Sequence, residues 1–560
     1  GYDQQEHTVV VTGGDVVEKN FELVPQVKEL ITYRAKAKVK RGADPYLEKL
    51  KINSGVSFDY ISNDRMTKTG DADVTAAAKR VPGVSTVGRF VSVRGLADRY
   101  IVTTVNGSRI PTLDPFTNNI SLDMFPTGLV DNLIINKTGS PEFPGDWSGA
   151  YLSINTTDFP SKLTVNVTSS FGYNPQTTWK PIVSSKGSDT DWLGYDNGYR
   201  GIPDGVAVDQ ADFPEYNPGS DLYEQMSYLG LGAYLNAYGI TANTPISEGD
   251  PYHLLGLVEL GFLAPALYND PAAGAAAVGA YNSQYGQAYF LPAFNAELES
   301  VGHSFNNDSW NVSEKTAPLN FSQSISIGNQ VQLFKRPLGF ITGLRYSRDT
   351  KYDEFSVARR TNSDPSEEPV ADIFDFRQKV SSEAAGWSAL ANVSYKFTDN
   401  NSISFLFMPN VQGQNDARSF RGSEFNFAAT EIVIGADQTY EEKQQLIYQV
   451  QSTNYLPKSK VRIDLNASYT DGQMNVLDFR EVIYYSDTVS GLTQFSSNSS
   501  LPRRFRFMDE DLFDARLGIE FPLDNTHGRP RKLMFGGAYR HNQRENLQVL
   551  YTVRGAAGID

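Results

Sequence analysis

The pattern that decides the fold is clearest at residues 461–469, which read Val-Arg-Ile-Asp-Leu-Asn-Ala-Ser-Tyr. Apolar or aromatic residues alternate here with polar or charged ones. Because successive side chains of a strand point to opposite faces, this period of two predicts a strand with one apolar and one polar face. The same alternation recurs in residues 163–168, 387–407 and 513–521. Each segment has about ten residues, the length that a tilted strand needs to cross the hydrocarbon layer.

Alternation alone fits a soluble β-sandwich as well as a membrane β-barrel. Two further features favour the barrel. Charges stand in rows on the polar faces, as a water-filled lumen allows: Arg462, Asp464, Arg516 and Glu520. Short turns such as residues 398–401 alternate with long loops, as in outer-membrane barrels. The 32 Phe and 30 Tyr residues suit interfacial aromatic girdles, although soluble cores use them too.

Bulk composition narrows the class of protein. The 65 acidic and 50 basic residues give a net charge of -15, which disfavours a nucleic-acid binder. Cysteine is absent, so disulfides, Cys-ligated zinc, iron–sulfur clusters and thiol catalysis are excluded. Residues 254–267 are the most apolar run, but they are too short for a transmembrane helix and contain Glu259. The chain starts at Gly1 without a leader, so we expect any signal peptide to be removed or to lie outside it.

The order of segments predicts four parts. Residues 1–24 contain two short β-rich runs around Gly13-Gly14-Asp15, as at the end of a small β-sandwich. Residues 25–55 are basic with little apolar periodicity, which is typical of a linker. A compact domain is expected at 56–160, and the alternating strands occupy 161–560. Within them, residues 200–315 form one long loop, which either faces a ligand or merely covers the barrel mouth; both interpretations stay open.

The compact domain at 56–160 mixes helix and strand signals. A short helix is expected within Asp71–Val81, ended by Pro82-Gly83. Strands are expected at residues 90–94, 100–105, 129–135 and 151–154. Asn106-Gly107 predicts a hairpin turn with positive φ. The domain is therefore predicted to be α+β.

Several strings within this domain resemble the plug domain of TonB-dependent outer-membrane receptors. They are FVSVRGLADRY at 90–100, TTVNG at 103–107, PTLDP at 111–115, DMFP at 123–126 and DWSGA at 146–150. The branch that the chain resembles is the Bacteroidota type, which carries a carboxypeptidase-regulatory-like sandwich before the plug and would account for residues 1–24. Three later strings are similar to that branch's early barrel: residues 191–196, 304–307 and 316–320. The name of the sandwich implies no peptidase.

The resemblance implies a transmembrane antiparallel β-barrel of about 22 strands, an even number, around an α+β plug. Only about ten or eleven strands are convincing between Ser161 and Asp560. An open sheet would leave unpaired backbone groups in lipid, so the chain is expected to be part of a longer receptor.

The resemblance also implies functional residues. The plug motif comprises Arg94, Gly95, Asp98, Arg99, Tyr100, Asn106 and Gly107. A buried guanidinium needs carboxylate partners, so Arg94 could form a charged lock between plug and barrel wall. A purely structural role for Arg94 within the plug is equally open. The glycines are expected to serve folding. The segment that lends an edge strand to TonB is assigned to Glu29, Leu30, Ile31, Thr32 and Tyr33, although it departs from the usual valine-rich string.

The function implied is energised uptake of an unidentified extracellular ligand across the outer membrane of a Gram-negative bacterium. The implied partners are TonB, outer-membrane lipids, the ligand, and a surface lipoprotein or other outer-membrane proteins. The alternative is a non-transporting structural or assembly component of an outer-membrane complex that keeps the receptor fold.

Enzymatic motifs are missing from the sequence. The five histidines are scattered, without a His-Glu-x-x-His string, and no Gly-x-Ser-x-Gly elbow or phosphate-binding loop occurs. Acidic groups at Asp71/Asp73 and at Asp509/Glu510/Asp511 offer calcium ligands, but solvated loop carboxylates are the favoured interpretation. We therefore expect neither catalysis nor a cofactor.

Overall fold

The computed structural model divides into two compact units, Gly1–Arg41 and Gly42–Asp560. The described residues are 13, 18, 43–52, 54–71, 73–87, 90–96, 100–116, 120, 122–125, 127–157, 160, 162–208, 302–305, 310–361, 371–424, 431–495, 500–523 and 531–554. The predicted sandwich end, most of the linker and the TonB segment at 29–33 lie outside these residues, as does most of the loop at 200–315.

The N-terminal part of the second unit, which we call the small domain (residues 44–156), contains a five-stranded sheet of order β1-β6-β7-β4-β5. Its strands are β1 (Phe58–Ser62), β4 (Ile101–Val105), β5 (Ser108–Arg109), β6 (Val130–Asn136) and β7 (Ala150–Thr156). Only the β4–β7 pair is parallel. A separate ladder joins β2 (Val84–Val87) to β3 (Phe90–Val93). The helices are α1 (Asp44–Ile52), α2 (Asn63–Thr69), α3 (Val74–Ala78), η2 (Leu122–Met124) and η3 (Thr127–Leu129).

Local chemistry explains where these elements begin and turn. The Asp73 side chain accepts a hydrogen bond from the Ala76 N–H and so caps α3, which is shorter than the helix predicted within 71–81. The predicted hairpin turn is confirmed, since Asn106 has φ 49° and Gly107 has φ 90° between β4 and β5. Positive φ at both positions defines a type I′ turn. The four predicted strands correspond to β3, β4, β6 and β7.

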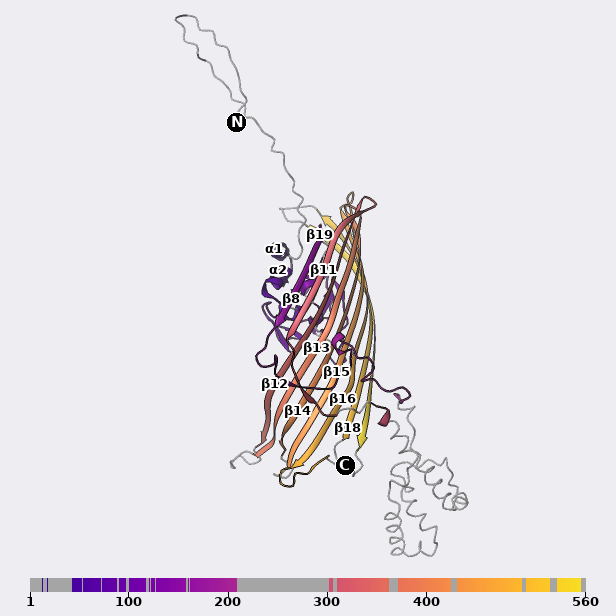
Figure 1. Cartoon of the computed structure of the whole chain (residues 1–560). Helices are drawn as coiled ribbons and strands as arrows, with labels where there is room; N and C mark the ends of the chain where they lie inside the picture. The colour runs from indigo at the N-terminus through magenta and orange to yellow at the C-terminus, as the bar shows by residue number, and fades with distance from the viewer. Residues whose placement is uncertain are drawn as a thin grey trace, which may run out of the picture. The chain divides into compact units, whose positions relative to one another are not determined.

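The C-terminal part forms one large antiparallel sheet, whose strands run side by side in Figure 1. The order is β19-β18-β16-β15-β14-β13-β12-β11-β8, and β17 pairs with β16. The bounds are β8 (Thr164–Gly172), β11 (Asn320–Leu333), β12 (Arg336–Thr361), β13 (Ala371–Thr398), β14 (Asn401–Glu424), β15 (Glu431–Leu456), β16 (Val461–Asp487), β17 (Thr493–Phe495), β18 (Ser500–Leu523) and β19 (Arg531–Arg554). Among the described residues the path is open, with β8 and β19 at its edges. The predicted mainly β class, with an α+β domain beside a large antiparallel sheet, is confirmed.

The strands are much longer than the ten residues predicted. The long ones, from β12 to β16 with β18 and β19, have 24 to 28 residues. At 28 residues, β13 extends about 90 Å along its axis, far more than a membrane requires. Apolar alternation marks only part of each strand, because the backbone ladder continues where both faces are polar.

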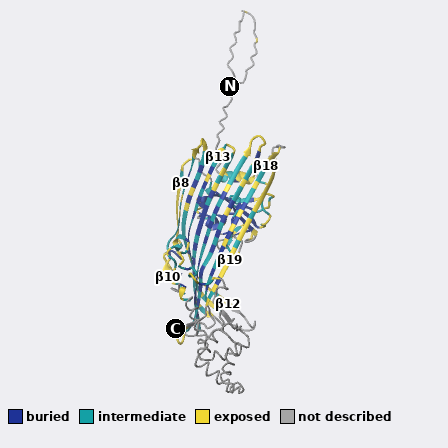
Figure 2. Ribbon diagram, turned by 90° about the vertical axis from the view of Figure 1, so that its right-hand side faces the viewer, coloured by how far each residue is buried: buried dark blue, intermediate teal, exposed yellow. Residues whose placement is uncertain are grey.

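The two faces of the sheet differ along the strands near their short turns. On one face, which we call the inner face, Leu406, Met408 and Ile447 belong to the same buried cluster as the core of the small domain. The opposite, outer face exposes Phe405 and Tyr469 by 47% and 43%. Figure 2 shows buried residues concentrated where the small domain meets the sheet. The predicted division into two faces is confirmed, with the small domain on the inner one.

A second chain segment lies on the outer face farther along the strands. It contains β9 (Pro181–Ser184), which pairs with β10 (Ser313–Thr316), and η4 (Asp191–Leu193). We call residues 181–208 the crossing segment, because it passes over several strands in Figure 1. In the described part of the chain, no helix is long and apolar enough to span a membrane.

Candidate functional site

The tip of the β4–β5 hairpin makes the first contact between the small domain and the inner face of the sheet. The Asn106 side chain accepts from the Thr156 N–H at 2.9 Å and donates to Gln449 Oε1 at 3.1 Å. Its carbonyl accepts from Asn466 Nδ2 at 2.8 Å, and Gln449 Nε2 donates to the Val105 carbonyl at 3.1 Å. The type I′ turn therefore places one predicted motif residue directly against β15 and β16.

A charged network makes the second contact. Arg516 of β18 donates to the Tyr151 hydroxyl of the small domain at 3.0 Å and to Asp514 Oδ1 at 3.1 Å. Arg540 of β19 lies 3.4 Å from Asp514 Oδ2 and 3.3 Å from Asp146 Oδ2. The Asp514 side chain is only 1% exposed, so one buried carboxylate holds two cations that both reach the small domain.

Asp146 belongs to the DWSGA string and is also paired with Arg109 within the small domain. Burial by itself would raise the pKa of the Asp146 carboxyl, but hydrogen bonds and charge from Arg109 and Arg540 outweigh it and lower the pKa. The carboxylate is therefore held ionised between two guanidinium groups.

A third contact involves the PTLDP string. Arg544 of β19 donates to Thr112 Oγ1 at 2.7 Å, to the Asp114 carbonyl at 3.2 Å and to Glu510 Oε2 at 2.6 Å. The Glu510 side chain is 2% exposed. Because the guanidinium spreads its donors over both parts of the protein, it ties a loop of the small domain to the sheet.

Neutral side chains complete this interface. Ser388 Oγ donates to the Met124 carbonyl at 3.0 Å, and Gln445 Nε2 donates to the Pro111 carbonyl at 3.3 Å. The DMFP and PTLDP strings therefore also lie against the sheet. We call the set of contacts made by Asn106, Tyr151, Asp146, Thr112 and their sheet partners the docking interface.

Of the two roles that stayed open for Arg94, the contacts among the described residues favour the structural one. Arg94 is exposed, and its Nη1 donates to the Lys137 carbonyl at 3.0 Å, inside the small domain. Arg94 and Gly95 both have positive φ, 55° and 75°, in the turn that follows β3. The arginines that link the small domain to the sheet are Arg516, Arg540 and Arg544. Only Arg516 was singled out from the sequence, as a charge on the polar face of a strand.

The other plug-motif residues serve local structure or lie outside the description. Tyr100 is 42% exposed, and its carbonyl accepts from the Gly149 N–H at 2.8 Å, which joins the two motif strings. Gly107 has a positive φ that a glycine adopts without strain. Asp98 and Arg99 are not among the described residues.

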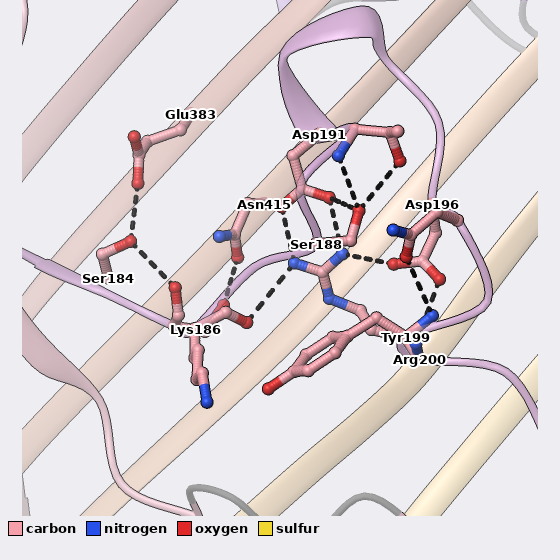
Figure 3. Close-up of polar contacts among 12 residues, drawn as sticks. Ser184, Lys186, Ser188, Asp191, Asp196, Tyr199, Arg200, Glu383 and Asn415 are labelled. Carbon is pink, nitrogen blue, oxygen red and sulfur yellow. Dashed lines mark hydrogen bonds and ion pairs between the residues drawn. The ribbon is translucent and has the colours of Figure 1, made fainter.

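The crossing segment holds a second charged cluster, shown in Figure 3. Arg200 donates to both carboxylate oxygens of Asp191 and to Asp196 Oδ1, each at 2.7 Å. Its guanidinium also lies 4.1 Å from the centre of the Tyr440 ring. The side chains of Arg200 and Asp196 are 5% and 2% exposed. Both acids come from the string at 191–196, which therefore folds around one buried arginine.

This cluster is fixed against the outer face of the sheet. Ser184 Oγ donates to Glu383 Oε1 at 2.7 Å and Ser185 Oγ to Asn415 Oδ1 at 2.5 Å. A Cβ on Gly194 would lie 2.9 Å from the Ala385 carbonyl oxygen, so the segment rests on strand backbone. Of the string at 304–307, only Ser304 and Phe305 are described, and the Phe305 ring lies 4.6 Å from the Arg503 guanidinium on the same face.

The acids considered as calcium ligands have protein partners. Asp71 accepts from Arg80 Nη2 at 2.8 Å, and Asp73 caps α3. Asp511 accepts from the Tyr469 hydroxyl at 2.5 Å, and Glu510 binds Arg544. The second group lies in β18 rather than in a loop. Among the described residues, no group of three or more His, Asp or Glu side chains could hold a metal ion.

Comparison with known proteins agrees with the small domain's architecture. Residues 51–146 match the family described as the TonB-dependent Receptor Plug Domain. No curated protein matches the chain. Among solved structures, the unliganded ferric citrate transporter FecA has 10% identity and a TM-score of 0.28 over 90% of this chain and 60% of that one. The ferric yersiniabactin uptake receptor FyuA from Yersinia pestis has 9% identity and a TM-score of 0.27, over 89% and 62%. The RagAB peptide importer in its closed-closed state has 9% identity and a TM-score of 0.27, over 87% and 60%.

The chain thus spans about 60% of the length of these receptors. The match over residues 51–146 includes four of the five strings that suggested a plug, and it reaches the first residue of the fifth, Asp146. Residues 51–146 of the small domain are therefore similar to the TonB-dependent receptor plug domain, and the small domain is called the plug domain below.

Proposed function

We propose that the chain is part of an outer-membrane TonB-dependent receptor that takes up a ligand through a plugged β-barrel. The observation that carries this proposal is the position of the plug domain, which packs through polar and apolar contacts on the inner face of a sheet whose outer face is apolar near the short turns. The Bacteroidota type, with a carboxypeptidase-regulatory-like domain before the plug, is part of the proposal.

The exposed outer face supports a location in the membrane. A row of aromatic residues crosses four adjacent strands, formed by Phe407, Tyr448, Tyr469 and Phe513. From Tyr469 to the start of β16 at Val461 the outer face extends about 26 Å along the strand. At a strand tilt of about 40° this covers roughly 20 Å of membrane thickness, most of the apolar band of about 25 Å that such barrels have. In a soluble sandwich the apolar face would be covered by a second sheet.

The docking interface supports a plug that moves, because polar contacts accompany the apolar ones made by sheet residues such as Leu406, Met408 and Ile447. Hydrogen bonds and ion pairs can be exchanged for contacts with water, so each neutral one contributes only about 1 kcal/mol net. The apolar contacts that sheet residues such as Met408 and Ile447 make with the plug resist displacement by roughly 25 cal/mol per Å², so a pull has to overcome them. We infer that pulling from the periplasm detaches the plug at Asn106, Asp146 and Tyr151.

The pulling site is proposed to be Glu29, Leu30, Ile31, Thr32 and Tyr33, which would pair with TonB as an added strand. Strand addition depends on backbone hydrogen bonds. Ile31→Pro removes one donor, whereas Ile31→Ala keeps it and serves as the matched control. We expect the proline variant of the detergent-purified chain to lose binding to the periplasmic domain of TonB, measured by calorimetry, and the alanine variant to retain it.

Equal TonB binding by both variants would contradict this assignment. If the unsubstituted chain binds no TonB at all, the alternative applies, namely a non-transporting component of an outer-membrane complex.

A further inference from the structure

The end of the large sheet that carries the short turns has an excess of positive charge, although the whole chain has a net charge of -15. This end comprises the turns at 334–335, 399–400 and 457–460 and the residues at the starts of β8 and β19. We call its cations the basic rim: Lys162, Lys335, Arg336, Lys396, Lys458, Lys460, Arg462, Arg531 and Lys532. The described acids at this end are Asp399, Asp464 and Glu520.

The acids compensate only part of the basic rim. Each has one partner, and the pairs Asp399–Arg336, Asp464–Arg462 and Glu520–Lys532 have distances of 3.5, 2.8 and 3.0 Å. The other cations are exposed and make no ion pair with a described residue: Lys162, Lys335, Lys396, Lys458, Lys460 and Arg531. At the opposite end of the strands, by contrast, Arg377 is paired with Glu354 and Lys379 with Glu314. The basic rim therefore suits a partner with negative charge.

The basic rim begins where the apolar outer face ends. Leu456 is exposed on the same side of β15 as the aromatic row, and Lys458 follows two residues later, at most about 7 Å along the chain. Leu333 and Lys335 repeat this spacing in the turn after β11, where Phe334 between them is 86% exposed. The headgroup layer on each side of a bilayer is about 5–8 Å thick. When the leucines lie in hydrocarbon, the lysines therefore reach the level of the lipid phosphates.

We propose that the basic rim binds the phosphate headgroups of anionic phospholipids in the leaflet that the short turns contact. A lysine donates charge-assisted hydrogen bonds to a phosphate, and the exposed Phe334 adds an apolar contact with the same leaflet. A zwitterionic lipid has the same phosphate, but its own cation already compensates the negative charge. The inference rests on the proposed function, which places the sheet in a membrane with its short turns toward the periplasm.

The test measures which phospholipid stays bound to the full chain in detergent. The chain is equilibrated in mixed micelles with equal amounts of phosphatidylglycerol and phosphatidylcholine, and native mass spectrometry counts the bound lipids of each kind. One variant combines Lys335→Gln, Lys458→Gln and Lys460→Gln. A basic residue near an anionic surface favours binding by about fivefold. We therefore expect about a fivefold excess of phosphatidylglycerol on the unsubstituted chain, and less than about twofold on the glutamine variant.

Two matched variants separate the basic rim from net charge and from folding. The first combines Lys180→Gln, Arg359→Gln and Arg421→Gln, which removes the same charge from exposed residues that lie away from the short turns and make no ion pair with a described residue. It should keep the fivefold excess. The second changes the three rim lysines to arginine, which preserves their charge, and it should keep the excess as well.

An unchanged lipid ratio in the glutamine variant, or an equal loss in the distant control, would overturn the proposal. Binding to purified peptidoglycan that requires the three lysines, beside a lipid ratio that does not, would assign the basic rim to the cell wall instead. Equal retention of both lipids by the unsubstituted chain refutes this inference alone. Retention of neither lipid contradicts the membrane location, and with it the proposed function, so the two failures are distinguishable.

Discussion

Replacing Asp514 by alanine tests whether the charged network holds the plug to the sheet. Asp514 lies 3.1 Å from Arg516 and 3.4 Å from Arg540, and both arginines continue to the plug domain. The substitution removes the only carboxylate that the described structure places between these two cations on the sheet side. Two neighbouring guanidinium groups then repel each other beside Tyr151 and Asp146.

The magnitude follows from the burial of Asp514. At an effective dielectric constant of about 20, each cation interacts with the carboxylate by about 5 kcal/mol before desolvation is subtracted. Removing one partner from a buried ion pair costs about 3–5 kcal/mol, because charge is left without compensation. With a side chain 1% exposed, Asp514 belongs in that range. An ion pair on the surface contributes only about 0–1 kcal/mol. Asp464→Ala is therefore the control, because the side chains of Asp464 and its partner Arg462 are about half exposed.

Trp147 provides the assay, because its ring lies 6.0 Å from that of Tyr151 at the interface. With the other four of the five tryptophans changed to phenylalanine, its fluorescence follows release of the plug during titration with urea. We expect Asp514→Ala to lower the free energy of plug release by about 3–5 kcal/mol and Asp464→Ala by less than about 1 kcal/mol. Equal effects of the two substitutions would refute the role given to the buried network.

Three further outcomes are expected. Gly107→Ala places a side chain at φ +90° and should weaken plug docking by about 1–2 kcal/mol in the Trp147 assay. Gly194→Ala, with φ +86° and a Cβ 2.9 Å from the Ala385 carbonyl oxygen, should expose the crossing segment to protease, whereas Gly537→Ala, with open space around it, should not. Asp146 has a pKa lowered below its ordinary value of about 3.9, so its contribution to docking is complete above pH 4 and is lost as pH falls through the lowered value. Acid titration of plug release should therefore show a step below pH 4 that disappears in Asp146→Asn.

The two-faced strands and the plug domain were predictable because each rests on local signals. Alternation in residues 461–469 indicates that the strand has one apolar and one polar face. The dipeptide Asn106-Gly107 favours a type I′ turn by itself, because both residues adopt positive φ readily. Strand length was not predictable in the same way. Along β13 and β16 the ladder continues past the apolar stretch, and hydrogen bonding between backbones leaves no period in the sequence.

The partners in the docking interface were not predictable, because they are hundreds of residues apart. Arg94 lies in a recognisable sequence motif, whereas Arg540 and Arg544 do not. The turn that Arg94 occupies nevertheless directs it to a hydrogen bond with the Lys137 carbonyl inside the plug domain. Arg540 and Arg544 come from a strand with weak alternation and acquire their roles only when β19 is added beside β18. Register between distant strands, rather than residue type, decides which arginine reaches the plug.

The outer face explains why only part of each strand carried a signal. In β14, Phe407 and Asn415 are eight residues apart and so point to the same side, yet Phe407 belongs to the aromatic row and Asn415 binds Ser185 of the crossing segment. One face thus passes from an apolar surface suited to lipid to a polar surface covered by protein within about 26 Å of strand. In the proposed membrane location, lipid would select apolar residues on the first stretch, whereas a protein cover allows hydrogen-bonding residues on the second. The boundary between them lies just beyond Tyr469, where Asp471 and Asp511 face each other across β16 and β18, and it marks the outer limit of the proposed membrane band.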